Sequence, residues 1–185
     1  MDWVRLAKDV GFEDVCELNM DSLIVMQEVR DMCSADRCRI YGTRWACPPG
    51  CGSLENCRKR MESYATGVLV QTVGKIEDSF DAEGIAEANR IHGKRFRLLT
   101  RMVRAAQPDC LPLSAGTCTR CEVCTYPDKP CRFPKKMFSS MEAYGLLVSD
   151  VCKESGMPYY RGPGTITFTS CILLERKANE RENDK

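Results

Sequence analysis

Thirteen cysteines and a single histidine define the side-chain chemistry available to this chain of 185 residues. Cysteine makes up about 7% of the chain, well above ordinary usage. Thiolates ligate metals in reducing compartments and pair as disulfides in oxidising ones. His92 alone excludes any metal site built on two or three imidazoles, and it is the one candidate for histidine-assisted activation of a nucleophile.

The cysteine group in residues 118–134 has the more diagnostic spacing. It reads CTRCEVCTYPDKPCRFP, with two two-residue spacers and then a six-residue gap. Three thiolates spaced in this way form a hook for three irons of one cubane, and the proline-flanked fourth cysteine resembles the bacterial ferredoxin run. The long gap suggests that all four ligate one cluster: Cys118, Cys121, Cys124 and Cys131.

Two other interpretations of this group stay open. Structural zinc usually takes two separated cysteine pairs, and a C-x-x-C-x-x-C run has one cysteine more than a pair needs. A thioredoxin-like redox pair at Cys121 and Cys124 would open a helix after a strand, whereas this segment is expected to be a loop. The spacing favours an iron–sulfur cluster over zinc.

The cysteine group in residues 33–57 is less regular. Its five cysteines exceed what one tetrahedral ion needs and match no single motif; they are Cys33, Cys38, Cys47, Cys51 and Cys57. Nearby prolines and glycines expose backbone N–H groups that can point at cluster sulfurs. We expect a second cluster here, with a zinc-stapled loop or partly buried free thiols as the alternatives.

Both cysteine groups lie in basic segments. Residues 31–61 hold six basic and three acidic side chains, and residues 118–137 hold five and two, so each segment carries net +3. A cubane with four thiolates is an anion, so nearby cations offset its charge and raise its reduction potential. The candidates are Arg37, Arg39, Arg44, Arg120 and Arg132.

The overall charge of +1, from 27 basic and 26 acidic residues, gives no general attraction to nucleic acid or membrane. No run approaches the roughly 20 apolar residues of a membrane span, and the first residues do not resemble a signal peptide, so we expect a cytoplasmic protein. No Gly-rich phosphate loop or dinucleotide fingerprint is present. A basic stripe in residues 90–104 suits an acidic partner or an anionic substrate, although most such stripes are solvated helix faces.

The elements that must position the cysteines suggest an α/β fold with a small three- or four-stranded sheet flanked by helices. The two cysteine-rich loops would lie at its rim. Apolar periodicity and capping residues predict helices at 1–12, 23–33, 54–64, 81–107 and 140–154. Strands are predicted at 66–73, 110–116 and 165–174. We expect one domain over residues 1–175 and a disordered charged tail over 176–185.

Three motifs together carry a family resemblance. They are C-x4-C-x2-YG-x2-W-x-CPP over residues 33–49, C-x2-C-x2-C with PCRFP over 118–134, and SMEAYG over 140–145. With GMPYYRGPGTITFTSCILL at 156–174, the chain resembles the predicted metal-binding proteins grouped as domain of unknown function 2284. The resemblance spans about residues 25 to 174.

The resemblance implies iron–sulfur binding in anaerobes and no established reaction or catalytic residue. It implies ligation by Cys33, Cys38, Cys47 and Cys57 at the first site, and by Cys118, Cys121, Cys124 and Cys131 at the second. Cys51 is not part of the family pattern, yet it is close enough to replace a ligand. The expected function is electron transfer or reductive chemistry by two [4Fe–4S] clusters, with a redox partner protein or a small molecule. The alternatives are an enzyme with an open-coordination cluster, acting on a small and possibly sulfur-containing substrate, and a zinc-stabilised interaction module.

Overall fold

A five-stranded mixed sheet organises the computed structural model, which describes residues 1–175. The strand order is β1-β2-β5-β3-β4, and every neighbouring pair is antiparallel except β3 and β4, which are parallel. The strands are β1 (Asp14–Glu17), β2 (Thr66–Lys75), β3 (Leu111–Ser114), β4 (Ser139–Ser140) and β5 (Thr165–Leu174). The longest two, β2 and β5, pair along their whole length and form the centre of the sheet.

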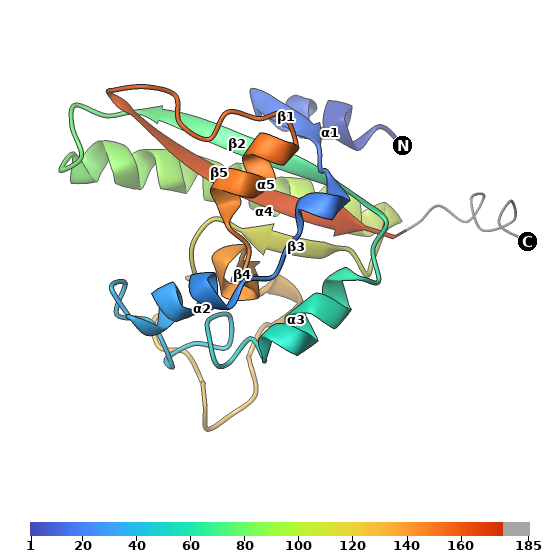
Figure 1. The fold of residues 1–185 in the computed structure, drawn as a ribbon, viewed down its shortest axis with the longest axis vertical. Helices are drawn as coiled ribbons and strands as arrows, with labels where there is room; N and C mark the ends of the chain where they lie inside the picture. The colour runs from blue at the N-terminus through green and yellow to red at the C-terminus, as the bar shows by residue number, and fades with distance from the viewer. Residues whose placement is uncertain (176–185) are drawn as a thin grey trace, which may run out of the picture.

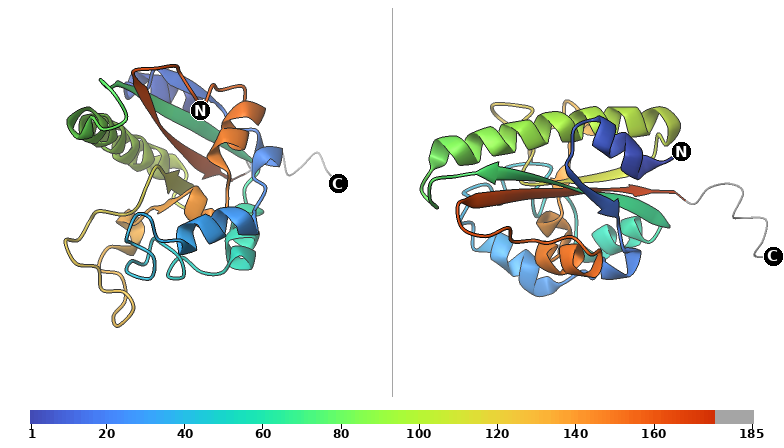
Figure 2. Two further views of the ribbon diagram at one scale, coloured as in Figure 1. Left: turned by 60° about the vertical axis from the view of Figure 1, so that its left-hand side comes forward. Right: turned by 90° about the horizontal axis from the view of Figure 1, so that it is seen from above.

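Helices cover both faces of this sheet (Figure 1). One face carries α1 (Trp3–Asp9) and α4 (Ala82–Ala106), as the view from above shows (Figure 2). The other face carries α3 (Leu54–Met61) and α5 (Val148–Glu154), with α2 (Gln27–Ser34) beside them. Three short 3-10 turns complete the elements: η1 (Met20–Ser22), η2 (Pro134–Lys136) and η3 (Glu142–Tyr144).

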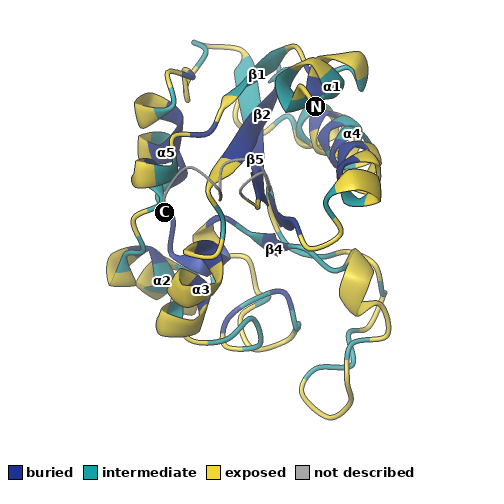
Figure 3. Ribbon diagram, turned by 90° about the vertical axis from the view of Figure 1, so that its right-hand side faces the viewer, coloured by how far each residue is buried: buried dark blue, intermediate teal, exposed yellow. Residues whose placement is uncertain are grey.

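Alternation along the central strands produces two apolar layers. Val70 and Ile172 pack with α4, whereas the neighbouring Leu69 and Leu173 pack with α3 and α5, because successive side chains of a strand point to opposite faces. Burial of each such aliphatic side chain stabilises the fold by about 1.5–3 kcal/mol relative to leaving it exposed. Figure 3 shows this buried sheet between its two helical layers.

Helix α4 confirms the prediction at 81–107. Asp81 caps it by accepting a hydrogen bond from the Gly84 N–H at 2.9 Å. Its buried residues recur at three- and four-residue steps, which is the pattern of an amphipathic helix. They are Ala88, His92, Phe96, Leu99, Thr100 and Val103.

The α/β prediction is confirmed, but the strand count of three or four is wrong because the sheet has five strands. The sequence does not predict β1 or β4, because strands of four and two residues give little periodicity. The helix predicted at 23–33 begins only at Gln27, since Val25 forms a β-bridge with Leu146.

The helix predicted over 140–154 is wrong in its first half. That segment contains β4 and η3, and Gly145 ends η3 in the left-handed conformation with φ +80°. The predicted tail at 176–185 lies outside the described residues. Within residues 1–175, no helix is long and apolar enough to cross a membrane.

Candidate metal centre

Two loops carry the cysteine groups to the same end of the molecule, next to α2 and α3 and below the sheet in Figure 1. The first loop follows α2 and ends at α3, and the second runs from β3 to β4. Arg44 of the first loop donates from Nη1 to the carbonyl of Cys118 at 3.1 Å and to that of Cys121 at 3.4 Å. One guanidinium therefore links the first loop to two cysteines that lie 74 and 77 positions later in the chain.

Contacts of Trp45 also hold the two cysteine loops against each other. Trp45 Nε1 donates to the Lys129 carbonyl at 3.0 Å, and its ring meets Tyr126 edge-to-face at 4.9 Å. Gly50 lies in this contact, because a Cβ there would meet the Arg44 carbonyl at 2.6 Å and the Tyr126 ring at 3.0 Å. The close approach of the two loops thus requires glycine at this position.

The structure brings all four predicted cysteines of the second group around one small cavity. The cavity is lined by Cys118, Cys121, Cys124 and Cys131. Arg44 and Trp45 of the first loop close it, together with Arg120 and Arg132 of the second. A cavity whose lining combines four thiols with three guanidinium groups suits an anionic centre ligated by sulfur.

Cys124 is the thiol of this group that the local structure shifts toward its thiolate form. Burial raises the pKa of Cys124, but backbone N–H groups of Tyr126, Trp45 and Thr125, together with Arg44, outweigh burial and leave the pKa below its usual value. One of these N–H groups comes from the first loop. Hydrogen bonds of this kind to a ligand sulfur also set the potential of a bound centre.

Three cysteines of the first group lie near one another: Cys33 at the end of α2, Cys38 on the surface, and Cys47. Cys47 Sγ is within 2.9 Å of Thr117 Oγ1, and Thr117 directly precedes Cys118 of the second group. Burial raises the pKa of Cys47, and this hydrogen bond opposes that effect. The two cysteine groups are thus neighbours as well as being individually compact.

Cys51 and Cys57 form a hydrogen-bonded pair beside these three. The hydrogen bond from Cys51 lowers the pKa of Cys57 to about 7, while burial acts against it and Arg30 assists it. The same hydrogen bond and burial raise the pKa of Cys51. Cys51 Sγ also faces the Ala143 carbonyl at 3.5 Å and is close to Cys47, so both members of the pair remain available to complete the first site.

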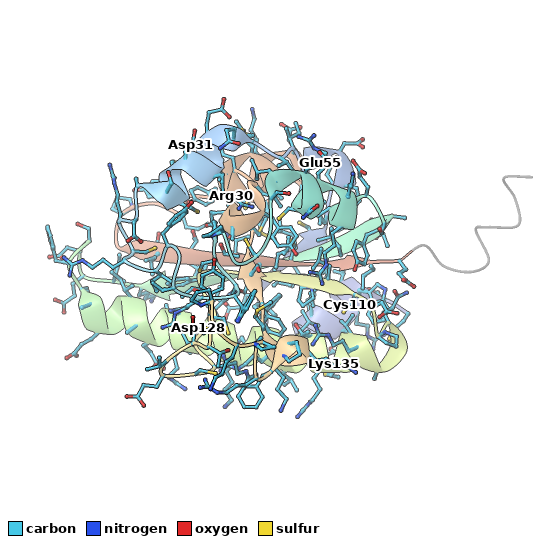
Figure 4. All side chains as sticks on the ribbon, turned by 90° about the horizontal axis from the view of Figure 1, so that it is seen from below. Arg30, Asp31, Glu55, Cys110, Asp128 and Lys135 are labelled. Carbon is cyan, nitrogen blue, oxygen red and sulfur yellow. The ribbon has the colours of Figure 1, made fainter. Side chains whose placement is uncertain are left out.

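Arg30 adds a cation to the first group. It projects from α2 toward α3 (Figure 4) and donates from Nη1 to the Gly52 carbonyl at 3.0 Å and from Nη2 to Cys57 Sγ at 3.5 Å. Its Nε is buried and has no hydrogen-bond partner within residues 1–175. A buried donor without a partner is costly, which fits an anionic group bound at this position.

All thirteen cysteines are free thiols, so no disulfide constrains either loop. Within residues 1–175, no three or more Cys, His, Asp or Glu side chains converge closely enough to hold one metal ion. Cys110, Cys152 and Cys171 are buried in the apolar layers, and the half-buried Cys16 packs against the layer that also contains Cys57. His92 is also buried, and both its ring nitrogens are hydrogen-bonded.

A second cavity, of about 560 Å³, opens between the two groups. Cys51 of the first group and Cys131 of the second both line it. Its wall includes the buried Tyr144, whose hydroxyl accepts a hydrogen bond from Arg60 Nη1 at 3.1 Å. Sequence reasoning did not find Arg30, Arg60, Thr117 or Tyr144, because none lies in a ligand motif and their roles arise only when the loops meet.

A family model described as "Predicted metal-binding protein (DUF2284)" matches residues 16–174, which is most of the chain. No curated protein and no solved structure matches the chain.

Proposed function

Because the chain belongs to this family of predicted metal-binding proteins, we propose that it binds two [4Fe–4S] clusters for electron transfer or reductive chemistry. When bound, the clusters supply single-electron oxidation and reduction. The electron acceptor or donor is a redox partner protein or a small molecule. The proposed ligands are Cys33, Cys38, Cys47 and Cys57 for the first cluster, and Cys118, Cys121, Cys124 and Cys131 for the second.

The observation that carries this proposal is the cavity lined by all four cysteines of the second group. Its donor set contains four thiols and no imidazole. A cubane places its irons at separate corners, so its ligand sulfurs are held apart by the body of the cluster, whereas a zinc ion draws four ligands to one point. Four thiols around one cavity supply enough ligands for either centre, and it is the ferredoxin-like spacing of these cysteines that favours the cluster.

The contacts between the groups support movement of electrons from one centre to the other. Cys47 of the first group is hydrogen-bonded to Thr117, the neighbour of Cys118. Arg44 bonds to the carbonyls of two second-group cysteines, and Arg30 bonds to Cys57 of the first. These two arginines offset negative charge at adjacent centres, which favours the reduced states.

A second candidate function is catalytic, and the 560 Å³ cavity favours it. A cluster with one open iron would face a space that already contains Arg60 and the Tyr144 hydroxyl, which suits a small substrate with oxygen or sulfur atoms. This candidate requires three protein ligands at one site. A Mössbauer spectrum that resolves one distinct iron would support it, and equivalent cysteine ligation of every iron would exclude it.

Anaerobic purification tests the proposal directly. We expect a brown protein with broad absorption near ~400 nm, about eight irons and about eight acid-labile sulfides per chain, and a paramagnetic signal after reduction with dithionite. A colourless protein that contains two zinc ions would overturn the proposal and establish the zinc-stabilised alternative.

Two serine variants test the fourth ligand of the first site. We expect Cys57→Ser to lower the iron content to about half, because the Cys57 thiol is already shifted toward the thiolate that iron requires. Cys51→Ser is the matched control and should keep the wild-type iron content. The opposite pattern would assign Cys51 in place of Cys57.

A further inference from the structure

A third cavity, of about 570 Å³, lies on the α4 side of the second cysteine loop. It is formed by the N-terminal half of α4, the loop that follows β3, and the residues around η2. Its volume falls within the roughly 300–1,000 Å³ of small-molecule pockets. Neither the family description nor the cluster proposal assigns it a role.

The charge on the wall of this cavity is entirely positive. Four cationic side chains line it, and no aspartate or glutamate does: Arg90, Arg97, Arg120 and Lys136. Arg90 pairs with Glu87 at 2.6 Å, but the other three form no ion pair within residues 1–175. A concave wall of unpaired cations concentrates positive potential and attracts small anions.

Only part of the basic stripe on helix α4 lines this cavity. Asn89, Arg90, Gly93 and Arg97 recur at three- and four-residue spacing and line the cavity, whereas Lys94 and Arg101 do not. A Cβ on Gly93 would lie 3.0 Å from Arg97 Nη1, so the guanidinium lies over the glycine. A mid-helix glycine costs about 1 kcal/mol relative to alanine, and here it leaves room for a cation.

The inner wall of the cavity is fixed by a buried polar network. His92 contacts Thr72 Oγ1 at 3.0 Å and Ser170 Oγ at 2.7 Å, and Ser170 Oγ accepts from the Ala115 N–H at 2.8 Å. His92 and Ala115 both line the cavity, and Cys118 follows three residues later. The network joins α4, the central strands and the start of the second cysteine loop, so this inner wall of the cavity is preformed.

We propose that this cavity binds a small, multiply charged oxyanion, a phosphate ester or a polycarboxylate, beside the second cysteine group. Arg97 of α4 and Lys136 of η2 bind the anion from two different elements. Arg120 lines both this cavity and the one enclosed by the four cysteines, so it couples the bound anion to that group. The binding step itself does not depend on which metal the cysteines hold.

Calorimetric titration of the anaerobically purified full-length protein tests the proposal, with pyrophosphate and citrate as probes at low and moderate salt. We expect saturable binding of at least one probe at one site per chain. The stronger ligand then identifies the source, phosphate ester or polycarboxylate. Arg97→Gln should weaken binding about tenfold or more, since it removes a charge-assisted hydrogen bond.

The matched control is Arg101→Gln, which removes the same charge from the same helix outside the cavity and should leave the affinity unchanged. Asn89→Trp keeps every cation but fills the cavity, and it should abolish binding. Equal losses of affinity in Arg97→Gln and Arg101→Gln would overturn the proposal. They would show that the anion responds only to the general positive charge of a solvated helix face. Absence of binding by both probes, with cluster content intact, would overturn it while leaving the cluster proposal standing.

Discussion

Cys57 and Cys124 both have a pKa below the usual thiol value, and they belong to different cysteine groups. The cause differs between them. At Cys57 it is the hydrogen bond from Cys51, with help from Arg30, whereas at Cys124 it is a set of backbone N–H groups that prevail over burial. In contrast, burial raises the pKa of Cys171 in the core. Metal binding requires thiolates, so the local structure lowers the cost of ligation at Cys57 and Cys124. Burial acts in the opposite direction at Cys33 and Cys47, whose pKa values are raised.

His92 allows a prediction about pH dependence at this same scale. Burial, with a smaller contribution from Arg95, lowers the pKa of His92 from 6.5 to about 4. The unfolded chain takes up a proton below pH 6.5 and the folded chain only near pH 4. The stability that neutral His92 confers above pH 6.5 is therefore lost as the pH falls toward 4, at up to about 1.4 kcal/mol per pH unit.

The chain has one histidine, so its ring C–H resonances can be assigned without ambiguity. We expect no inflection of their chemical shifts between pH 8 and 5.5. An inflection near pH 6.5 would show that the imidazole is solvated and would contradict the buried network. Urea unfolding at several pH values then measures the associated loss of stability.

At the scale of elements, the sequence predicts those helices and strands whose formation depends on residues within the same segment. Apolar periodicity along α4 and the run of valines in β2 are signals contained within each segment, so the sequence predicts both elements. The helix predicted at 140–154 is wrong because Gly145 adopts φ +80°, which ends the preceding turn. A Cβ at this position would lie 2.7 Å from the Leu54 side chain, and this tertiary constraint cannot be seen in the local sequence. Spacing could not predict that Trp45 and Tyr126 would join the two cysteine loops, because that contact is tertiary.

Helix α3 illustrates how a local cap supports the first site. Ser53 accepts a hydrogen bond from the Asn56 N–H at 3.2 Å and begins the helix that presents Cys57. We expect Ser53→Ala to lower the free energy of unfolding by about 1 kcal/mol in urea titrations, because a helix N–H loses its acceptor. Ser53→Asp should retain wild-type stability, since aspartate also caps. Equal destabilisation by both changes would show that the cap is not the cause.

At the scale of the whole molecule, the apolar layers and the cysteine loops are held by different forces. The sheet lies between two buried clusters, whereas no residue from 116 to 138 is fully buried, and only Ala46 and Pro48 are buried within residues 35–53. The loops depend on a few hydrogen bonds between them, such as those of Arg44 and Trp45, and in our proposal on bound clusters. Folding of the sheet and ordering of the loops are therefore separable.

Removal of metal under anaerobic conditions should reveal this separation. After treatment with a chelator and dithionite, we expect faster amide hydrogen exchange in residues 35–53 and 116–138. Exchange in β2, β5 and α4 should stay slow, because their hydrogen bonds lie between apolar layers. Simultaneous loss of protection in the strands and the loops would contradict this expectation.

The position of β5 has a consequence for biosynthesis. This strand follows both cysteine groups in the chain, yet it occupies the middle of the sheet between β2 and β3. A chain is made from its N-terminus, so both groups leave the ribosome while the sheet still lacks its central strand. During that interval the thiols are accessible to iron-delivery factors and to oxidants alike. Under the cluster proposal, the window for loading, and for oxidative damage, is thus set by the time needed to synthesise and insert β5.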